Sequence, residues 1–138
     1  MDGLAFLDHT GDIGFDVRAD TLEELFRRAG RGLYEILIER LPAATGVEET
    51  LELQEEAPDL LLRTFLSELL YRFLASRTIL VDFPELRIAE NRLQARGATA
   101  RFNPVRDGLR TELKAVTYHQ LDVRRDGPGW LARIIFDV

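Results

Sequence analysis

The sequence predicts an α+β domain in which two helices pack on one face of a largely antiparallel sheet. Two long stretches place apolar residues at helical spacing, and the stretches around them alternate apolar and polar residues as strands do. The predicted order of elements, β-β-α-β-α-β-β-β-β, fits this class. A chain of 138 residues is expected to form one domain, spanning residues 1–138.

The two predicted helices have clear ends. The first begins at Thr21, which forms a capping box with Glu24, and it ends before Pro42. Its apolar face consists of Leu22, Leu25, Phe26, Ala29, Leu33, Ile36 and Leu37. The second begins at Pro58, which a first helical turn tolerates, and runs to about Ala75. Its apolar face consists of Leu61, Leu62, Phe65, Leu66, Leu69, Phe73 and Leu74.

The remaining regular segments are predicted to be strands. They span residues 4–9, 12–18, 47–54, 79–90, 93–102, 113–123 and 130–138. Asn91 is expected in a turn, residues 103–108 form a loop, and the glycines of residues 125–129 indicate a hairpin turn.

Composition excludes several classes of function. The net charge of −6 argues against the chain holding nucleic acid by neutralising phosphates. The absence of cysteine excludes disulfides and thiolate metal sites, so a metal would need oxygen or imidazole ligands. No segment has the length and apolarity of a membrane span or a signal peptide, so we expect a soluble, cytoplasmic protein. Lys114 is the only lysine beside seventeen arginines.

The stretch from Leu7 to Gly14 is the densest in chemically active groups. It contains two carboxylates, an imidazole, a hydroxyl and two glycines between apolar flanks. Strand alternation puts Asp12 at the start of the second strand, where a turn exposes it. Two interpretations remain open from these residues alone: a polar turn between two strands, or an acidic cation site.

Two later stretches also carry chemistry. The segment from Lys114 to His119 contains the only lysine and one of two histidines, which ordinary strand roles would also explain. The chain ends on an apolar strand, with the Asp137 side chain beside the carboxylate of Val138. We expect the Val138 side chain to join the core. An ordered apolar terminus implies that its carboxylate has a partner, either a basic group or a cation.

Together these stretches resemble the archease family. The segments that match it are His9-Thr10-Gly11-Asp12-Ile13-Gly14, Thr21-Leu22-Glu23-Glu24-Leu25-Phe26, Leu61-Leu62, Phe65-Leu66-Ser67-Glu68-Leu69-Leu70-Tyr71, Lys114-Ala115-Val116-Thr117-Tyr118-His119 and Asp137-Val138. The family usually has alanine at the position of Gly11. It commonly has glutamate, aspartate and histidine in the loop before the lysine, where this chain has Ala100, Asn103 and Asp107.

The resemblance implies both a fold and a function. The implied fold is a duplicated split β-α-β arrangement. The implied function is activation of the GTP-dependent tRNA-splicing ligase, promoting its guanylylation and turnover, by a protein that is not itself an enzyme. It also implies a divalent-cation site formed by Asp12, Asp137 and Val138, with Ca²⁺ expected and Mg²⁺ or Mn²⁺ as alternatives. His9, Lys114 and His119 are candidates for supporting the cation ligands or contacting the ligase.

Two other functions remain open at this point. A metal-dependent hydrolase would use Asp12, Asp137 and His9, with the metal activating a water molecule. A chaperone-like interaction module would use apolar surface without chemistry. We expect the ligase as the partner, with no direct binding to nucleic acid or membrane; the sequence does not indicate the oligomeric state.

Overall fold

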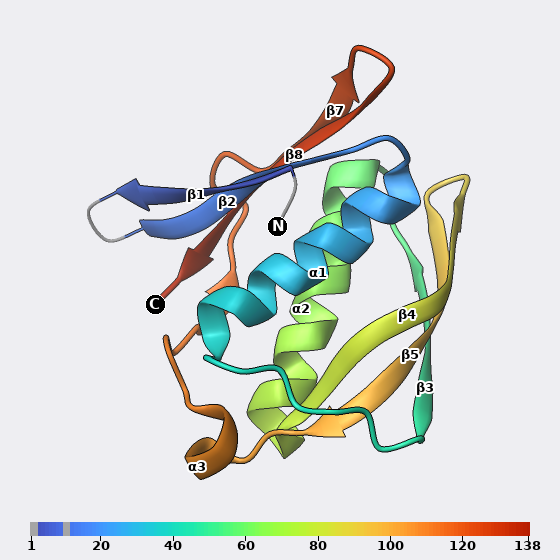
Figure 1. The fold of residues 1–138 in the computed structure, drawn as a ribbon. Coiled ribbons are helices and arrows are strands. Elements are labelled where there is room, and N and C mark those ends of the chain that lie inside the picture. The colour runs from blue at the N-terminus through green and yellow to red at the C-terminus, as the bar shows by residue number, and fades with distance from the viewer. Residues whose placement is uncertain (1–2, 10–11) are drawn as a thin grey trace.

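The computed structural model describes residues 3–9 and 12–138, and for residues 8, 9 and 12 it describes the backbone only. In chain order, the described elements are β1 (Leu4–His9), β2 (Asp12–Ala19), α1 (Leu22–Leu37), β3 (Glu48–Gln54), α2 (Pro58–Ser76), β4 (Thr78–Ala89), β5 (Arg92–Arg101), α3 (Pro104–Asp107), β6 (Ala115–Val116), β7 (Asp122–Asp126) and β8 (Gly129–Asp137). The order confirms the predicted α+β class (Figure 1).

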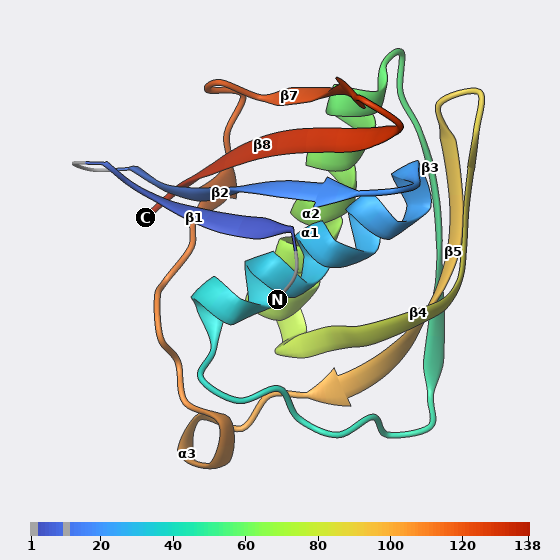
Figure 2. The same ribbon diagram turned by 45° about the horizontal axis from the view of Figure 1, so that its top comes forward.

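The strands form two antiparallel sheets, where the sequence pattern predicted one. The larger sheet has the order β1-β2-β8-β6, with β7 also paired to β8, and the smaller has the order β3-β5-β4. Both long helices contact strands of both sheets and lie between them (Figures 1 and 2). The alternation within a strand shows that one face is buried, but it does not show which other strands share its sheet.

Several element boundaries differ from the predicted ones for local reasons. α1 ends at Leu37 because Ile38 is already extended and forms a bridge with Leu109. The predicted strand over 113–123 is divided into β6 and β7 by a turn in which Gln120 has a positive φ of 52°. The predicted loop over 103–108 contains the short helix α3.

The turns and caps that the sequence predicted are confirmed. The Glu24 N–H donates to the Thr21 hydroxyl at 3.1 Å, which closes the start of α1. Glu90 and Asn91 both have positive φ, as required by the two-residue turn that joins β4 to β5.

One hydrophobic core lies between the two sheets and is formed by residues of the two long helices and of both sheets. Aromatic rings connect its parts: the ring centroids of Phe26 and Phe65 are 5.6 Å apart, and those of Phe65 and Phe83 are 5.2 Å apart. Gly32 lets α1 approach β2 closely, because an added Cβ would lie 2.8 Å from the ring of Phe15.

Side chains from the helices bond to the edge strands of both sheets. The Arg27 Nε–H of α1 donates to the Phe83 carbonyl at 3.0 Å, and the Arg63 Nε–H of α2 donates to the Val116 carbonyl at 3.0 Å. The Leu80 N–H donates to the Tyr34 hydroxyl at 3.0 Å. These bonds satisfy backbone groups on β4 and β6 that would otherwise be open to pairing with another chain.

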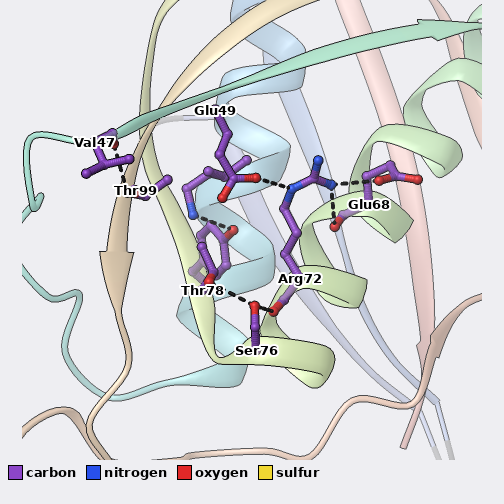
Figure 3. A network of polar contacts seen from close by, with 9 residues as sticks. Val47, Glu49, Glu68, Arg72, Ser76, Thr78 and Thr99 are labelled. Atoms are coloured by element: carbon purple, nitrogen blue, oxygen red, sulfur yellow. Dashed lines mark hydrogen bonds and ion pairs between the residues drawn. The ribbon is translucent and has the colours of Figure 1, made fainter.

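A charged network ties α2 to the smaller sheet (Figure 3). The Arg72 guanidinium donates to Glu49 of β3 at 2.9 Å and to Glu68 of α2 at 2.6 Å. Burial acts to lower the pKa of Arg72, but bonds to the two carboxylates outweigh it and raise the pKa. The network therefore holds β3, the outer strand of this sheet, against the helix.

Candidate functional site at the ends of strands β2 and β8

The sheet order brings together segments that lie far apart in the sequence. β2 begins at Asp12, β8 ends at Asp137, and the two strands pair with Ile13 opposite Phe136. The backbone of Asp12, one residue before Ile13, therefore lies beside the end of β8. Figure 1 shows the C-terminus close to the start of β2. On the outer side of β2, His9 of β1 lies opposite Asp12.

The lysine segment lies on the other side of β8. Ala115 of β6 is paired with Asp137, and the Lys114 N–H donates to the Asp137 carbonyl at 2.8 Å. The side chains of Lys114 and Asp137 are both exposed. The ends of β1 and β8 and the starts of β2 and β6 therefore lie at one end of the larger sheet. All three stretches that the sequence singled out contribute to this end.

Val138 does not join the core. Its side chain is 48% exposed, whereas Phe136 is fully buried. The predicted alternation of buried residues along the last strand therefore ends at Phe136. Val138 follows Asp137, the last residue of β8 that pairs with a described strand.

Gly14 has a structural role in the first of these stretches. A Cβ at this position would lie 2.1 Å from the Ile134 carbonyl oxygen and 3.0 Å from the Ile135 Cα. Only glycine allows β2 and β8 to come this close. The glycine of the motif therefore sets the spacing between the two strands that carry Asp12 and Asp137.

The segment that follows Lys114 is fixed by hydrogen bonds from both sides. The N–H and the hydroxyl of Thr117 both donate to the Ile135 carbonyl at 3.0 Å, and the His119 N–H donates to the Thr117 hydroxyl at 3.1 Å. The His119 side chain is exposed and contacts the Gln120 amide at 3.3 Å. Its exposure excludes the core role that ordinary strand packing would give it.

Arg63 of α2 also holds this segment in place. The sequence did not indicate this role. Besides its bond to the Val116 carbonyl, its guanidinium stacks on the ring of Tyr118 at 3.8 Å from the ring centroid. The sequence offers little signal for this role, because an arginine on the polar face of a predicted helix is ordinarily solvated.

The loop that departs from the family pattern uses its polar groups internally. Asn103 caps α3 by accepting the N–H groups of Val105 and Arg106 at 3.0 and 3.1 Å. The Asp107 carboxylate accepts from the Arg106 guanidinium, which holds the pKa of Asp107 below its usual range, and from the Asn103 N–H at 2.8 Å. Ala100 is fully buried. The Asn103 side-chain carbonyl oxygen and the Asp107 carboxylate therefore stabilise the loop.

The structure places the predicted metal ligands only in part. Among the side chains that it describes, no three His, Asp or Glu residues are close enough together to hold a metal ion. The side chains of Asp12 and His9 lie outside that description, so a site formed with Asp137 and Val138 stays a prediction. In the described ranges, none of the helices has the length and apolarity needed to cross a membrane.

A second concave feature lies away from the chain end. A groove of about 310 Å³ runs between α1, β4 and the segment after α1. Its floor includes Ile38, Leu41 and Phe83, and arginine and acidic side chains surround it. Sequence reasoning did not find it, because its residues come from three separate segments.

Comparisons with known proteins identify the family. Residues 5–138 match the model of the Archease protein family (MTH1598/TM1083). The chain is 34% identical to the protein archease of Methanopyrus kandleri over 139 residues, covering 96% of each chain. It is 30% identical to that of Methanosarcina mazei over 137 residues, covering 96% of this chain and 94% of the relative.

Solved structures show the same fold. The solution structure of Methanobacterium thermoautotrophicum protein 1598 covers 100% of both chains with a TM-score of 0.79 at 27% identity. The crystal structure of a Thermotoga maritima archease, described as a possible chaperone, has a TM-score of 0.64 at 22% identity, covering 96% of this chain and 94% of that one. The family match, the relatives and the fold agree, and the chain belongs to the archease family.

Proposed function

We propose that this chain activates the GTP-dependent tRNA-splicing ligase, promoting its guanylylation and turnover without catalysing a reaction itself. Family membership supports this proposal, because resemblance to the archease family implies a role in assisting that ligase. The observation that carries it is the strand register, which puts the backbones of Asp12 and Asp137 side by side at one end of the larger sheet. A ligase partner of this kind would place the chain in the cytoplasm.

The activator would act through a divalent cation held by Asp12, Asp137 and the carboxylate of Val138. These groups supply hard oxygen ligands, which suit Ca²⁺ first and Mg²⁺ or Mn²⁺ as alternatives. Carboxylates at neighbouring strand ends repel each other, and a bound cation would relieve that repulsion. The Asp137 side chain is exposed, as a ligand that takes up a cation from solvent must be. The cation would supply positive charge where the ligase presents phosphate.

The residues around the ligands would orient them and meet the partner. Lys114 holds the backbone of Asp137 through its N–H, and its exposed ammonium group would contact the ligase. His9 of β1 lies opposite Asp12 of β2, and at this position it would support Asp12 as a metal ligand. His119 is exposed beside the same segment, which favours a contact with the ligase over support of the ligands.

The test is a ligase turnover assay with wild type, Asp12→Ala and Asp137→Ala, together with calorimetric titration of Ca²⁺. Removing a ligand should lower metal affinity by about tenfold or more, with loss of activation and an unchanged fold. Asp122→Ala is the matched control, because Asp122 is a partly exposed aspartate of the same sheet that pairs with Arg124. It should leave both properties unchanged.

Two outcomes would contradict the proposal. Equal Ca²⁺ binding by wild type and both site variants would exclude the cation site. A ligase whose turnover is the same with and without wild-type protein would exclude activation. Metal-dependent cleavage of a generic phosphoester that is lost in Asp137→Ala would instead indicate a hydrolase.

A further inference from the structure

One side of α2 is partly open to solvent, whereas the opposite side is buried in the core. Arg63, Ser67, Tyr71 and Leu74 follow each other at spacings of four, four and three residues, so they lie along one side of the helix. Tyr71 is 66% exposed and Leu74 is 51% exposed. The row is about 16 Å long at the rise of an α-helix.

Tyr118 extends this row onto the larger sheet. Its ring is 64% exposed and stacks on the guanidinium of Arg63, which also bonds to the Val116 carbonyl. Arg63 therefore connects the helix row to the segment after β6. Both long side chains are already held in place, so binding through them would lose little conformational entropy. We call Arg63, Ser67, Tyr71, Leu74 and Tyr118 the α2 surface.

The composition of the α2 surface is that of a protein interface. Tyrosine and arginine dominate the residues that carry binding energy between proteins, and acidic residues are depleted from interface centres. The α2 surface contains two tyrosines, an arginine and a leucine, and none of its five residues is acidic.

Three cationic residues belong to the α2 surface or to the segments next to it. Arg63 lies within it, Arg77 follows Leu74 at the end of α2, and Lys114 lies two residues before the carbonyl that Arg63 binds. The acidic residues closest along the helix have other contacts: Asp59 accepts the Leu60 N–H at 2.8 Å, and Glu68 pairs with Arg72 at 2.6 Å. The surface therefore complements a partner that carries carboxylates.

We infer that the α2 surface is the docking surface for the ligase. The matching region of the ligase would be an apolar patch bordered by carboxylates. This inference rests on the proposed function. A second copy of the chain fits less well. A symmetric contact would bring the same cationic side chains of both copies together, between two molecules of net charge −6. The α2 surface supplies affinity, while the cation site acts on the ligase once it is bound.

The experiment measures the Kd for the purified ligase and, in the same preparations, the dependence of ligase turnover on protein concentration. The variants are Tyr118→Ala and Leu74→Ala, with Leu41→Ala as the matched control, because Leu41 is 50% exposed on a different face. Tyr118→Ala and Leu74→Ala should each raise Kd by about tenfold with maximal activation retained at saturating protein. Leu41→Ala should leave Kd unchanged. All four proteins should have the same thermal midpoint, since these side chains are exposed.

A pair of substitutions at Tyr71 tests the charge of the partner. Tyr71→Glu should raise Kd more than Tyr71→Lys, since both place a good helix-forming residue at the same exposed position. The reverse order would overturn the inference, as would equal Kd values for wild type and the two alanine variants. Two other results would assign the surface to a different partner, provided that ligase affinity is unchanged. Loss of dimerisation in Leu74→Ala would indicate a second copy of the chain, and loss of tRNA binding in Tyr118→Ala would indicate tRNA. If wild type neither binds nor activates the ligase, the proposed function itself fails.

Discussion

The hydroxyl of Tyr34 connects α1 to the edge of the smaller sheet, and Tyr34→Phe removes that connection alone. The side chain is 4% exposed, and its oxygen accepts the Leu80 N–H at 3.0 Å. Burial raises the pKa of Tyr34, so the hydroxyl is neutral in the folded protein at neutral pH. Phenylalanine keeps the ring and its packing but leaves the Leu80 N–H without an acceptor.

The cost of this change follows from the burial of the orphaned donor. Leaving a buried N–H without its partner costs about 1–3 kcal/mol of unfolding free energy. At about 2.1 cal/mol/K per residue, unfolding this chain has an entropy near 0.3 kcal/mol/K, so the thermal midpoint should fall by about 3–10 °C. Urea unfolding followed by circular dichroism should show a lower midpoint with an unchanged m-value.

Two further measurements make this prediction specific. Tyr71→Phe is the control, because the Tyr71 hydroxyl is on an exposed side chain, and it should change stability by less than about 0.5 kcal/mol. Hydrogen exchange at the Leu80 amide should become faster in Tyr34→Phe, while amides in β2 keep their protection. A variant as stable as wild type, with the Leu80 amide still protected, would refute the role assigned to this bond.

Three other changes give defined outcomes. Gly14→Ala should lower stability by roughly 3 kcal/mol in urea unfolding, because its Cβ would lie 2.1 Å from the Ile134 oxygen; a change under about 1 kcal/mol would contradict this close approach. Asp16 is bonded to the Arg133 guanidinium at 2.7 and 2.8 Å, which lowers its pKa from 3.8, so Asp16→Asn should cost about 0.5–1 kcal/mol at neutral pH. That difference should disappear as the pH falls through the lowered pKa, and a gap that persists in acid would contradict it. A C-terminal tag replaces the carboxylate of Val138 with an amide, so it should impair Ca²⁺ binding and ligase activation; performance equal to an N-terminally tagged form would exclude this carboxylate as a ligand.

Local sequence signals predicted most of the long elements but not their assembly. The helical spacing of apolar residues and the Thr21 cap predicted both long helices, and Asn91 predicted the turn between β4 and β5. The division into two sheets depends on which strands pair, and a strand that buries one face looks the same in either sheet. Ile38 illustrates the limit: it continues the apolar pattern of α1, yet it leaves the helix because Leu109, far along the chain, pairs with it.

The segments of the candidate site could be predicted from the sequence, but the contacts between them could not. Resemblance to a family singled out Asp12, Asp137 and the Lys114 segment, and the sheet order places their backbones together. The role of Arg63 could not be predicted, because it depends on a contact between α2 and a two-residue strand more than fifty positions later. Contacts of this kind leave no periodic pattern in the sequence.

Each long helix uses an arginine side chain to bind a backbone carbonyl of an edge strand. The tyrosines associated with these two bonds differ in their exposure, and this difference is relevant to function. Arg27 and Arg63 each donate Nε–H to a carbonyl of an edge strand at 3.0 Å, which blocks that strand from pairing with another chain. Two turns further along α1 from Arg27, Tyr34 is buried and its hydroxyl accepts a hydrogen bond from the same edge strand, β4. Beside Arg63, Tyr118 is exposed, so its ring adds stacking with the guanidinium but little buried area. Stability alone would favour burying such a ring, since burial of apolar area contributes more than an exposed stack. An exposed tyrosine held rigid by an arginine is better suited to binding a partner than to stabilising the chain that carries it.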